Sequence, residues 1–153
     1  HTIERSELEA FISERKVPVT ITEDHTYDLM QICDVCLAAS GTATLETAMM
    51  ELPTVLLYKV SPITYGIGKM VVNLTHVGLP NIVAGKEVIP ELLQGDVSVD
   101  AIVNTVLPLF DDLHINQSML TELRGVKEKL GESGAVNRVA QLIYDLGKER
   151  INE

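Results

Sequence analysis

The hydrophobic and polar positions of this 153-residue chain follow helical and strand periodicities in turn. Residues 2–15 set large apolar side chains among Glu, Arg and Ser at helical spacing, and that pattern stops before Pro18. Residues 17–22 have an alternating pattern that is rich in β-branched side chains, and they predict a strand. Residues 27–32 predict a short helix. The near-continuous apolar run of residues 34–39 predicts a buried strand.

The same alternation continues beyond a Ser-Gly-Thr turn at residues 40–42. Apolar residues recur at helical spacing from Leu45 through Met49 to Leu52, Pro53 ends this helix, and residues 54–58 predict the next strand. Further along, the pattern predicts a turn with a short strand over 78–85, and helices over 63–73, 100–110, 115–130 and 135–149. Strands that alternate with helices through short connections predict an α/β fold, a Rossmann-like parallel sheet flanked by helices on both faces.

Composition and charge narrow the classes of function. The formal net charge is −10, and Lys and Arg are scattered rather than gathered into a stripe, so we expect no nucleic-acid partner. No apolar run approaches the roughly 20 residues of a membrane-spanning helix, and the N-terminus lacks the layout of a signal peptide. These features predict a soluble intracellular protein. The first residue is His1 and not Met, so we expect further residues upstream.

Ser40, Gly41 and Thr42 stand where a buried strand is predicted to turn into a helix. Gly41 allows a ligand close to the backbone, the two hydroxyls can hydrogen-bond, and the free N–H groups of a first helical turn attract an anion. This pattern favours a phosphate site, although a Ser or Thr that only caps a helix gives the same spacing. Glu46 is not needed for a capping box, so its carboxylate either accepts from vicinal sugar hydroxyls or is solvated.

Three other features carry less specific signals. Lys59, at the predicted carboxyl end of a strand, suits a phosphate or is a surface lysine. Asn81 suits a sugar or an amide, or is only a turn residue. Cys33 and Cys36 have CxxC spacing, but a zinc site needs further ligands and a thioredoxin-like motif leads into a helix. We therefore expect two small, partly buried side chains there and no metal.

Two segments, SGTATLETAMMELPTVLLYKVSPITY and VGLPNIVAGKEVIPELLQ, resemble the C-terminal lobe of lipid-A-disaccharide synthase, a family 19 glycosyltransferase. The resemblance implies a GT-B fold, in which two Rossmann-like lobes hold a nucleotide sugar and an acceptor. It implies an inverting enzyme that moves a diacylglucosamine unit from UDP-2,3-diacylglucosamine to 2,3-diacylglucosamine 1-phosphate, without a metal or cofactor.

The resemblance also implies roles for individual residues. The turn of Ser40, Gly41 and Thr42 would face the donor diphosphate, and Glu46 would face the ribose hydroxyls. The other substrate-binding candidates are Asn81, Lys59, Glu91 and Gln94. No catalytic residue is expected in this chain, because the general base would belong to an N-terminal lobe upstream.

On this resemblance, residues 1–153 form a single truncated C-terminal nucleotide-sugar-binding lobe, and the helix within 134–153 packs on the N-terminal lobe. The full protein would act as a peripheral protein at the cytoplasmic face of a bacterial inner membrane, where it meets its lipid acceptor. The candidates for a lipid-facing surface, or for core packing, are Ile63, Ile67, Met70 and Val71. The edge of an incomplete sheet also predicts a homodimer.

Two alternatives to this function remain open. One is another GT-B transferase that uses a donor of the UDP-N-acetylglucosamine type. The other is a nucleotide-binding or interaction module that carries out no chemistry by itself, and we expect the isolated chain to be inactive.

Overall fold

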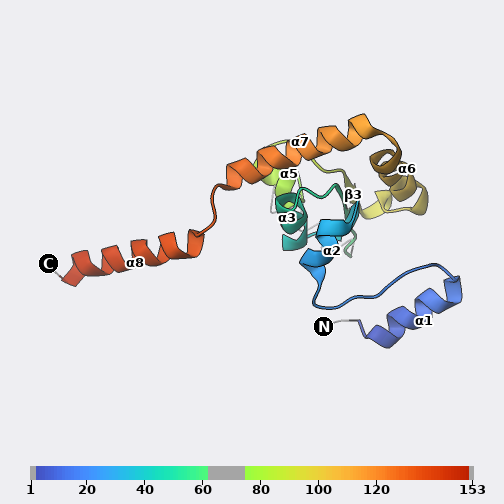
Figure 1. Ribbon diagram of the computed structural model, residues 1–153, viewed down its shortest axis with the longest axis horizontal. Coiled ribbons are helices and arrows are strands. Elements are labelled where there is room, and N and C mark those ends of the chain that lie inside the picture. Colours follow the sequence, from blue (N-terminus) through green and yellow to red (C-terminus); the bar gives the residue numbers. More distant parts are fainter. Residues whose placement is uncertain (1–2, 62–74, 152–153) are drawn as a thin grey trace. The chain divides into compact units, whose positions relative to one another are not determined.

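The computed structural model of the chain describes residues 3–61 and 75–151 and contains two compact units, His1–Ile32 and Cys33–Glu153 (Figure 1). The first unit holds helices α1 (Arg5–Arg15) and α2 (Thr26–Ile32), as the apolar spacing predicts. The strand predicted over residues 17–22 is wrong, because that stretch is irregular and largely exposed. An extended segment needs a neighbouring strand for its N–H and C=O groups, and the described residues supply none there.

The second unit contains a three-stranded parallel sheet, and this confirms the predicted α/β fold. The strands are β1 (Cys36–Ala39), β2 (Thr54–Tyr58) and β3 (Glu91–Leu93), in the order β1-β2-β3. Ala39 lies opposite Leu57, and Tyr58 lies opposite Leu93. β3 has no counterpart among the predicted elements, because three residues are too few to show a periodicity.

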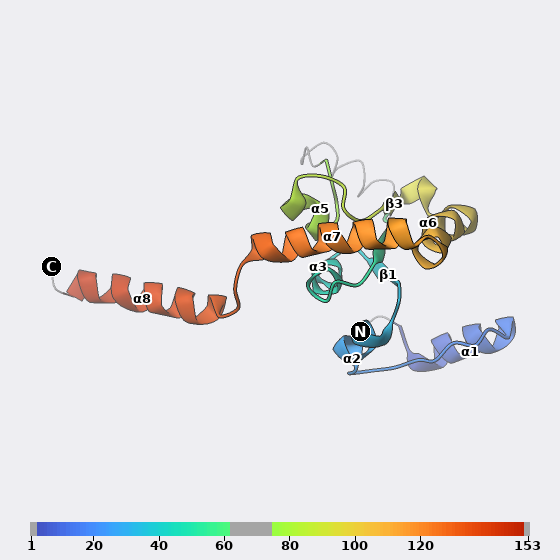
Figure 2. The ribbon, with the colours of Figure 1, turned by 45° about the horizontal axis from the view of Figure 1, so that its top comes forward.

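Three helices form one packed layer on this sheet. α3 (Thr42–Met49), α5 (Leu79–Ala84) and α7 (Leu113–Leu130) contact one another, and α3 also contacts β1 and β2. Figure 2 shows α7 lying across α3 and α5. α6 (Val99–Asp111) packs on α7. The buried core of this unit consists of Ala48, Val55, Leu56, Val88, Ile89, Leu109, Met119, Leu123 and Val126. Burying a large apolar side chain stabilises the fold by about 1.5–3 kcal/mol, so this core fixes α3 on the sheet.

The inward face of α3 carries threonines where the sequence predicts a wholly apolar stripe. Thr44 and Thr47 are 0% and 1% exposed, whereas Met49, which the prediction placed inside, is 38% exposed. The hydroxyl of Thr44 donates to Gly41 O at 2.8 Å, and that of Thr47 donates to Thr44 O at 2.9 Å. Burial therefore leaves neither hydroxyl unsatisfied, which is why polar residues are tolerated on this face.

Residues 79–84 form the helix α5, so the turn and short strand predicted over 78–85 are wrong. Pro80 lies in the first turn, where its fixed φ favours a helix start and its missing N–H breaks no helical hydrogen bond. Gly85, with φ 75°, ends the helix, and its N–H donates to Asn81 O at 2.8 Å. A proline near the start and a glycine after the end are helix signals that outweigh the β-branched residues between them.

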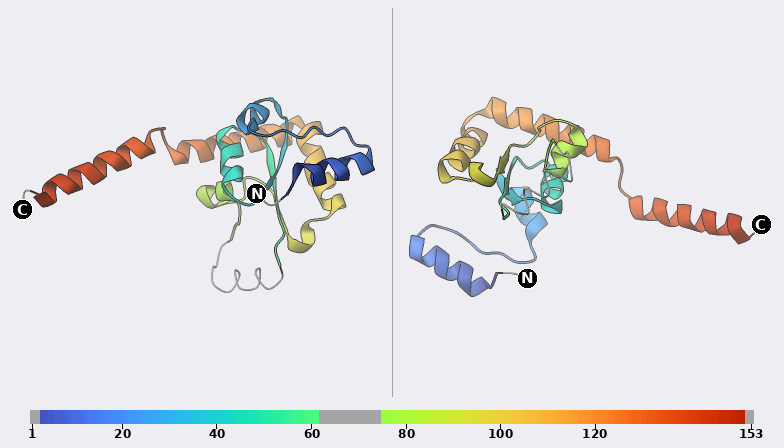
Figure 3. Two further views of the ribbon diagram at one scale, coloured as in Figure 1. Left: turned by 90° about the horizontal axis from the view of Figure 1, so that it is seen from below. Right: turned by 180° about the vertical axis from the view of Figure 1, so that it is seen from behind.

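The last described element is α8 (Ala135–Ile151), one continuous helix that follows Gly131 and Gly134 (Figure 3). Both glycines have positive φ values, which end α7 and separate the two helices as predicted. The helix predicted over 63–73, with the lipid-facing candidates Ile63, Ile67, Met70 and Val71, lies outside the described residues. Within the described ranges, no helix has the length and hydropathy needed to cross a bilayer.

Candidate functional site

The carboxyl ends of the three strands bring most of the candidate residues to one edge of the sheet. Ser40 follows β1, Lys59 follows β2, and Gln94 follows β3. Because the strands are parallel and paired in register, these three positions lie along the same edge. In open α/β sheets, ligands bind outside this edge.

The turn from β1 into α3 is built around Gly41. Its φ of 140° and ψ of −164° define a backbone conformation that is open to glycine and strained for other residues. A Cβ atom built on Gly41 would meet no atom within 4 Å, so the space beside the turn is open. Gly41 is also the N-cap of α3 and provides no capping side chain. The N–H of Thr44 donates to Gly41 O at 3.2 Å, whereas the N–H groups of Thr42 and Ala43 have no acceptor among the described residues and can bind an anion.

The side chains around this turn are available for a ligand. Ser40 is half-buried and Thr42 is exposed, and neither hydroxyl bonds to a residue that the structure describes. Glu46 lies one turn further along α3 and is half-buried, and its carboxylate has no hydrogen bond or ion pair within the described part of the chain. A carboxylate one turn beyond an anion site can accept hydrogen bonds from hydroxyls, as the ribose-binding acid does in dinucleotide sites.

Lys59 and Gln94 complete this edge. Lys59 is exposed directly after β2. Gln94 has φ 50°, a left-handed value that is unusual for a residue other than glycine. Its Oε1 accepts from the N–H of Val60 at 3.4 Å, whereas its Nε2 is buried and has no hydrogen-bond partner among the residues that the structure describes. The sequence placed Gln94 among the candidates but gave no sign of this unpaired donor.

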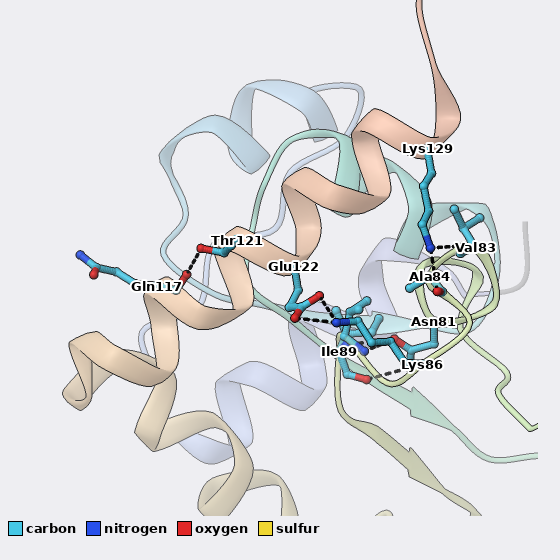
Figure 4. A network of polar contacts seen from close by, with 10 residues as sticks. Asn81, Val83, Ala84, Lys86, Ile89, Gln117, Thr121, Glu122 and Lys129 are labelled. Atoms are coloured by element: carbon cyan, nitrogen blue, oxygen red, sulfur yellow. Dashed lines mark hydrogen bonds and ion pairs between the residues drawn. The ribbon is translucent and has the colours of Figure 1, made fainter.

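Asn81 and Glu91 do not join this group, because their polar atoms bond to the neighbouring main chain. Asn81 is 0% exposed, and its Oδ1 accepts from the N–H groups of Val88 at 2.7 Å and Ile89 at 2.9 Å. Its Nδ2 donates to Ile89 O at 2.8 Å and to Glu91 Oε1 at 2.7 Å. Figure 4 shows Asn81 directed at Ile89 beneath α7. No spacing in the sequence predicts this pairing of two candidate residues.

Glu91 also holds the residues that lead into α5. Its Oε2 accepts from the N–H of Val77 at 2.9 Å, and its Oε1 accepts from the N–H of Gly78 at 2.9 Å. A Cβ on Gly78 would lie 3.1 Å from Glu91 Oε1 and 3.1 Å from a methyl of Leu56, so a larger residue here would require both side chains to shift. The eight candidates thus divide into six residues at or near the sheet edge and the pair Asn81 and Glu91, which bond to each other.

The cysteines and acidic residues do not form a metal site in the part of the chain that the structure describes. Within the described residues, no three His, Cys, Asp or Glu side chains are grouped closely enough to hold a metal ion. Cys33 is exposed, and Cys36 is half-buried. Burial raises the pKa of the Cys36 thiol, and the neighbouring Cys33 raises it further. A raised pKa makes Cys36 a poor nucleophile and a poor metal ligand at neutral pH.

The chain is similar to known proteins over most of its length. The family model described as lipid-A-disaccharide synthetase matches residues 3–143. The chain is 46% identical over 132 residues to the lipid-A-disaccharide synthase of Geobacter sulfurreducens, covering 86% of this chain and 34% of that protein. It is 42% identical over 137 residues to that of Persephonella marina, covering 86% and 36%. It is 34% identical over 152 residues to that of Syntrophotalea carbinolica, covering 96% and 39%. The chain therefore spans a little over a third of the length of these relatives.

Proposed function

Since the chain belongs to the lipid-A-disaccharide synthase family, we propose that it is the donor-binding part of a glycosyltransferase that makes a lipid A disaccharide. The donor is UDP-2,3-diacylglucosamine, and the acceptor is 2,3-diacylglucosamine 1-phosphate. The observation that carries this proposal is the open Ser40–Gly41–Thr42 turn at the carboxyl edge of the sheet, with the free carboxylate of Glu46 one helical turn away.

Each residue of the open edge has a role in this proposal. The first N–H groups of α3 and the hydroxyls of Ser40 and Thr42 bind the diphosphate, and Glu46 accepts from the ribose hydroxyls. Lys59 neutralises phosphate charge, and Gln94 donates from Nε2 to an oxygen of the donor once its amide turns out of the buried position it has in the free chain. Because UDP is the leaving group, these contacts strengthen as negative charge develops on the diphosphate, and they lower the barrier to its departure.

The remaining parts of the reaction lie outside this chain in our proposal. The general base that activates the acceptor hydroxyl belongs to an N-terminal lobe, and the reaction inverts the anomeric centre. The full-length enzyme works as a peripheral protein at the cytoplasmic face of a bacterial inner membrane, where both acylated substrates are found. This chain by itself binds the donor and is inactive.

Calorimetric titration of the chain tests the donor site. UDP and UDP-N-acetylglucosamine should bind more tightly than ADP, because the proposed donor carries uridine. Equal affinity for ADP and UDP would contradict the proposal and leave a general nucleotide-binding module. In the full-length enzyme, turnover of UDP-N-acetylglucosamine as efficiently as the diacylated donor would favour the other kind of GT-B transferase.

Substitution of Glu46 tests its role within the site. Glu46→Ala should weaken UDP binding by about 10- to 100-fold, the effect of losing a hydrogen bond to a charged group. Glu128→Ala provides the control, because Glu128 is an exposed carboxylate on α7. Unchanged UDP affinity in Glu46→Ala would show that Glu46 is an ordinary solvated residue of the helix.

A further inference from the structure

Asn81 has no hydrogen-bonding capacity left for a substrate. An asparagine amide carries two N–H donors and an oxygen that accepts about two bonds. In this structure both donors and both acceptor positions are occupied by Val88, Ile89 and Glu91. The side chain is also fully buried, so a ligand at the sheet edge could reach it only after these bonds were broken.

Asn81 bonds to the residues on either side of Pro90, and the carbonyl oxygen of Pro90 accepts a hydrogen bond from β2. The N–H of Leu56 in β2 donates to Pro90 O at 2.9 Å. Asn81 holds the main chain of Ile89 directly before Pro90, and the carboxylate of Glu91 directly after it. Pro90 is therefore fixed on both sides by one buried side chain.

β3 depends on this support because it is short. It has three residues and pairs only with β2 among the described strands. Two or three backbone hydrogen bonds give a strand little stability of its own, and short edge elements open most readily. Glu91 adds a second attachment, because its carboxylate accepts from the N–H groups of Val77 and Gly78 at the start of α5.

The position of Gln94 depends on the position of β3, which it follows directly. Gln94 follows β3 immediately, in a left-handed conformation, and its Oε1 reaches the N–H of Val60 beyond the end of β2. A shift of β3 along β2 would break this contact and would move the unpaired Nε2 away from the sheet edge.

We propose that Asn81 is a positioning residue, which together with Glu91 fixes β3 on β2 and so places Gln94 at the donor site without itself touching the donor. The role of Gln94 rests on the proposed function. The control of β3 by Asn81 does not depend on any ligand.

Hydrogen exchange of the free chain tests whether Asn81 fixes β3 on β2. Asn81→Ala should accelerate exchange of the Leu56 and Val60 amides at least tenfold, because their acceptors, Pro90 O and Gln94 Oε1, are released. Thr54→Val is the matched control: it removes a buried hydroxyl bond to Leu52 O in the same sheet and should leave the Val60 amide unchanged. Unaltered exchange at both amides in Asn81→Ala would overturn the proposal.

Glu91→Gln provides a second variant if Asn81→Ala does not fold. It keeps the size of the side chain and leaves Asn81 in place, but it puts an amide N–H₂ group where a carboxylate oxygen accepts from the main chain. The same two amides should exchange faster, by a smaller factor. No change in their exchange would again contradict the positioning role.

A double-mutant cycle on UDP affinity tests whether Asn81 affects UDP binding through Gln94. If Asn81 acts through Gln94, Asn81→Ala should weaken UDP binding in the native chain and add less than twofold to the effect of Gln94→Ala. Additive losses of UDP affinity would mean that Asn81 contacts the donor directly. Native UDP affinity in Gln94→Ala would show that Asn81 does not act through Gln94. The exchange result separates these failures from a failure of the donor site itself, because it requires no ligand.

Discussion

Gly41 is the residue on which the proposed anion site depends most directly. Gly41→Ala should destabilise the chain by about 1–3 kcal/mol, the strain of a side chain at φ 140° and ψ −164°. The cost is conformational and not steric, because a Cβ atom there would meet no atom within 4 Å. Chemical denaturation of the variant measures this loss. An unchanged free energy of unfolding would show that the turn adopts an ordinary backbone conformation.

Gln94 combines two unfavourable features in one side chain. Its left-handed backbone and its buried, unpaired Nε2 both reduce stability in the absence of a ligand. Gln94→Gly should therefore raise the thermal midpoint of the free chain while weakening UDP binding. Differential scanning calorimetry with and without UDP measures both changes. A variant that is less stable without UDP would show that Gln94 is held for structural reasons alone.

At the scale of the residue, the sequence identifies the types of side chain at the site but not their bonding. Ser40, Thr42 and Glu46 are recognisable because they surround a predicted strand-to-helix turn, and the structure leaves them open. Asn81 and Glu91 look equally available in the sequence. Their mutual bond joins residues ten positions apart across a loop, and no helical or strand period predicts such a contact.

The elements of the fold follow the sequence where periodicity is long enough to read. β2 and the long helices α6 and α7 lie at or within two residues of their predicted bounds. α5 and β3 are too short for a periodicity, so capping residues and tertiary contacts decide them. Residues 17–22 have the pattern of a strand, but pairing is a property of two segments and cannot be read from one.

The helix α7 contains one residue that limits its stability. Gly125 lies in the helix interior, and a Cβ atom built there would meet no atom within 4 Å. Gly125→Ala should stabilise the chain by about 0.5–1 kcal/mol, since alanine loses less backbone entropy on folding. Thermal unfolding measures this gain. A lower midpoint would reveal a crowded surface at this position.

An ion-pair cluster joins the end of α3 to α7. Glu51 accepts from Lys127 Nζ at 2.8 Å and from Arg124 Nε at 2.9 Å. The hydrogen bond from Lys127, followed by that from Arg124, holds the pKa of Glu51 below its usual value of 4.5. A lowered pKa stabilises the folded state above pH 4.5, and this stabilisation is lost as the pH falls through the lowered value.

Glu51→Gln should therefore reduce the free energy of unfolding at pH 7 by about 0.5 kcal/mol, a modest effect because the three side chains are partly solvated. The difference between the variant and the native chain should disappear in acid, below the lowered pKa. Urea titrations at several pH values provide the measurement. A difference that stays constant down to pH 2 would show that the ion pairs do not contribute.

At the scale of the whole molecule, α8 differs from the other helices of its unit because every side chain described in it is exposed. Its apolar residues include Val139, Leu142, Ile143 and Leu146, which are 53–66% exposed. Removal of residues 135–153 should shift the thermal midpoint of the remaining chain by less than about 2 °C, because little buried surface is lost. It should also reduce self-association in sedimentation experiments, because an exposed apolar surface is removed. A large fall in the midpoint would show that α8 is part of the folded core.

The way in which Asn81 is bonded also predicts how substitutions will be tolerated along this segment. Asn81 contacts Val88 and Ile89 through their main-chain groups, which every residue except proline provides in full. In a library of single substitutions selected for function, position 88 should therefore accept other apolar residues of similar size, whereas position 81 should accept almost none. A short loop of variable sequence would then keep a constant shape, because a single side chain outside it determines that shape.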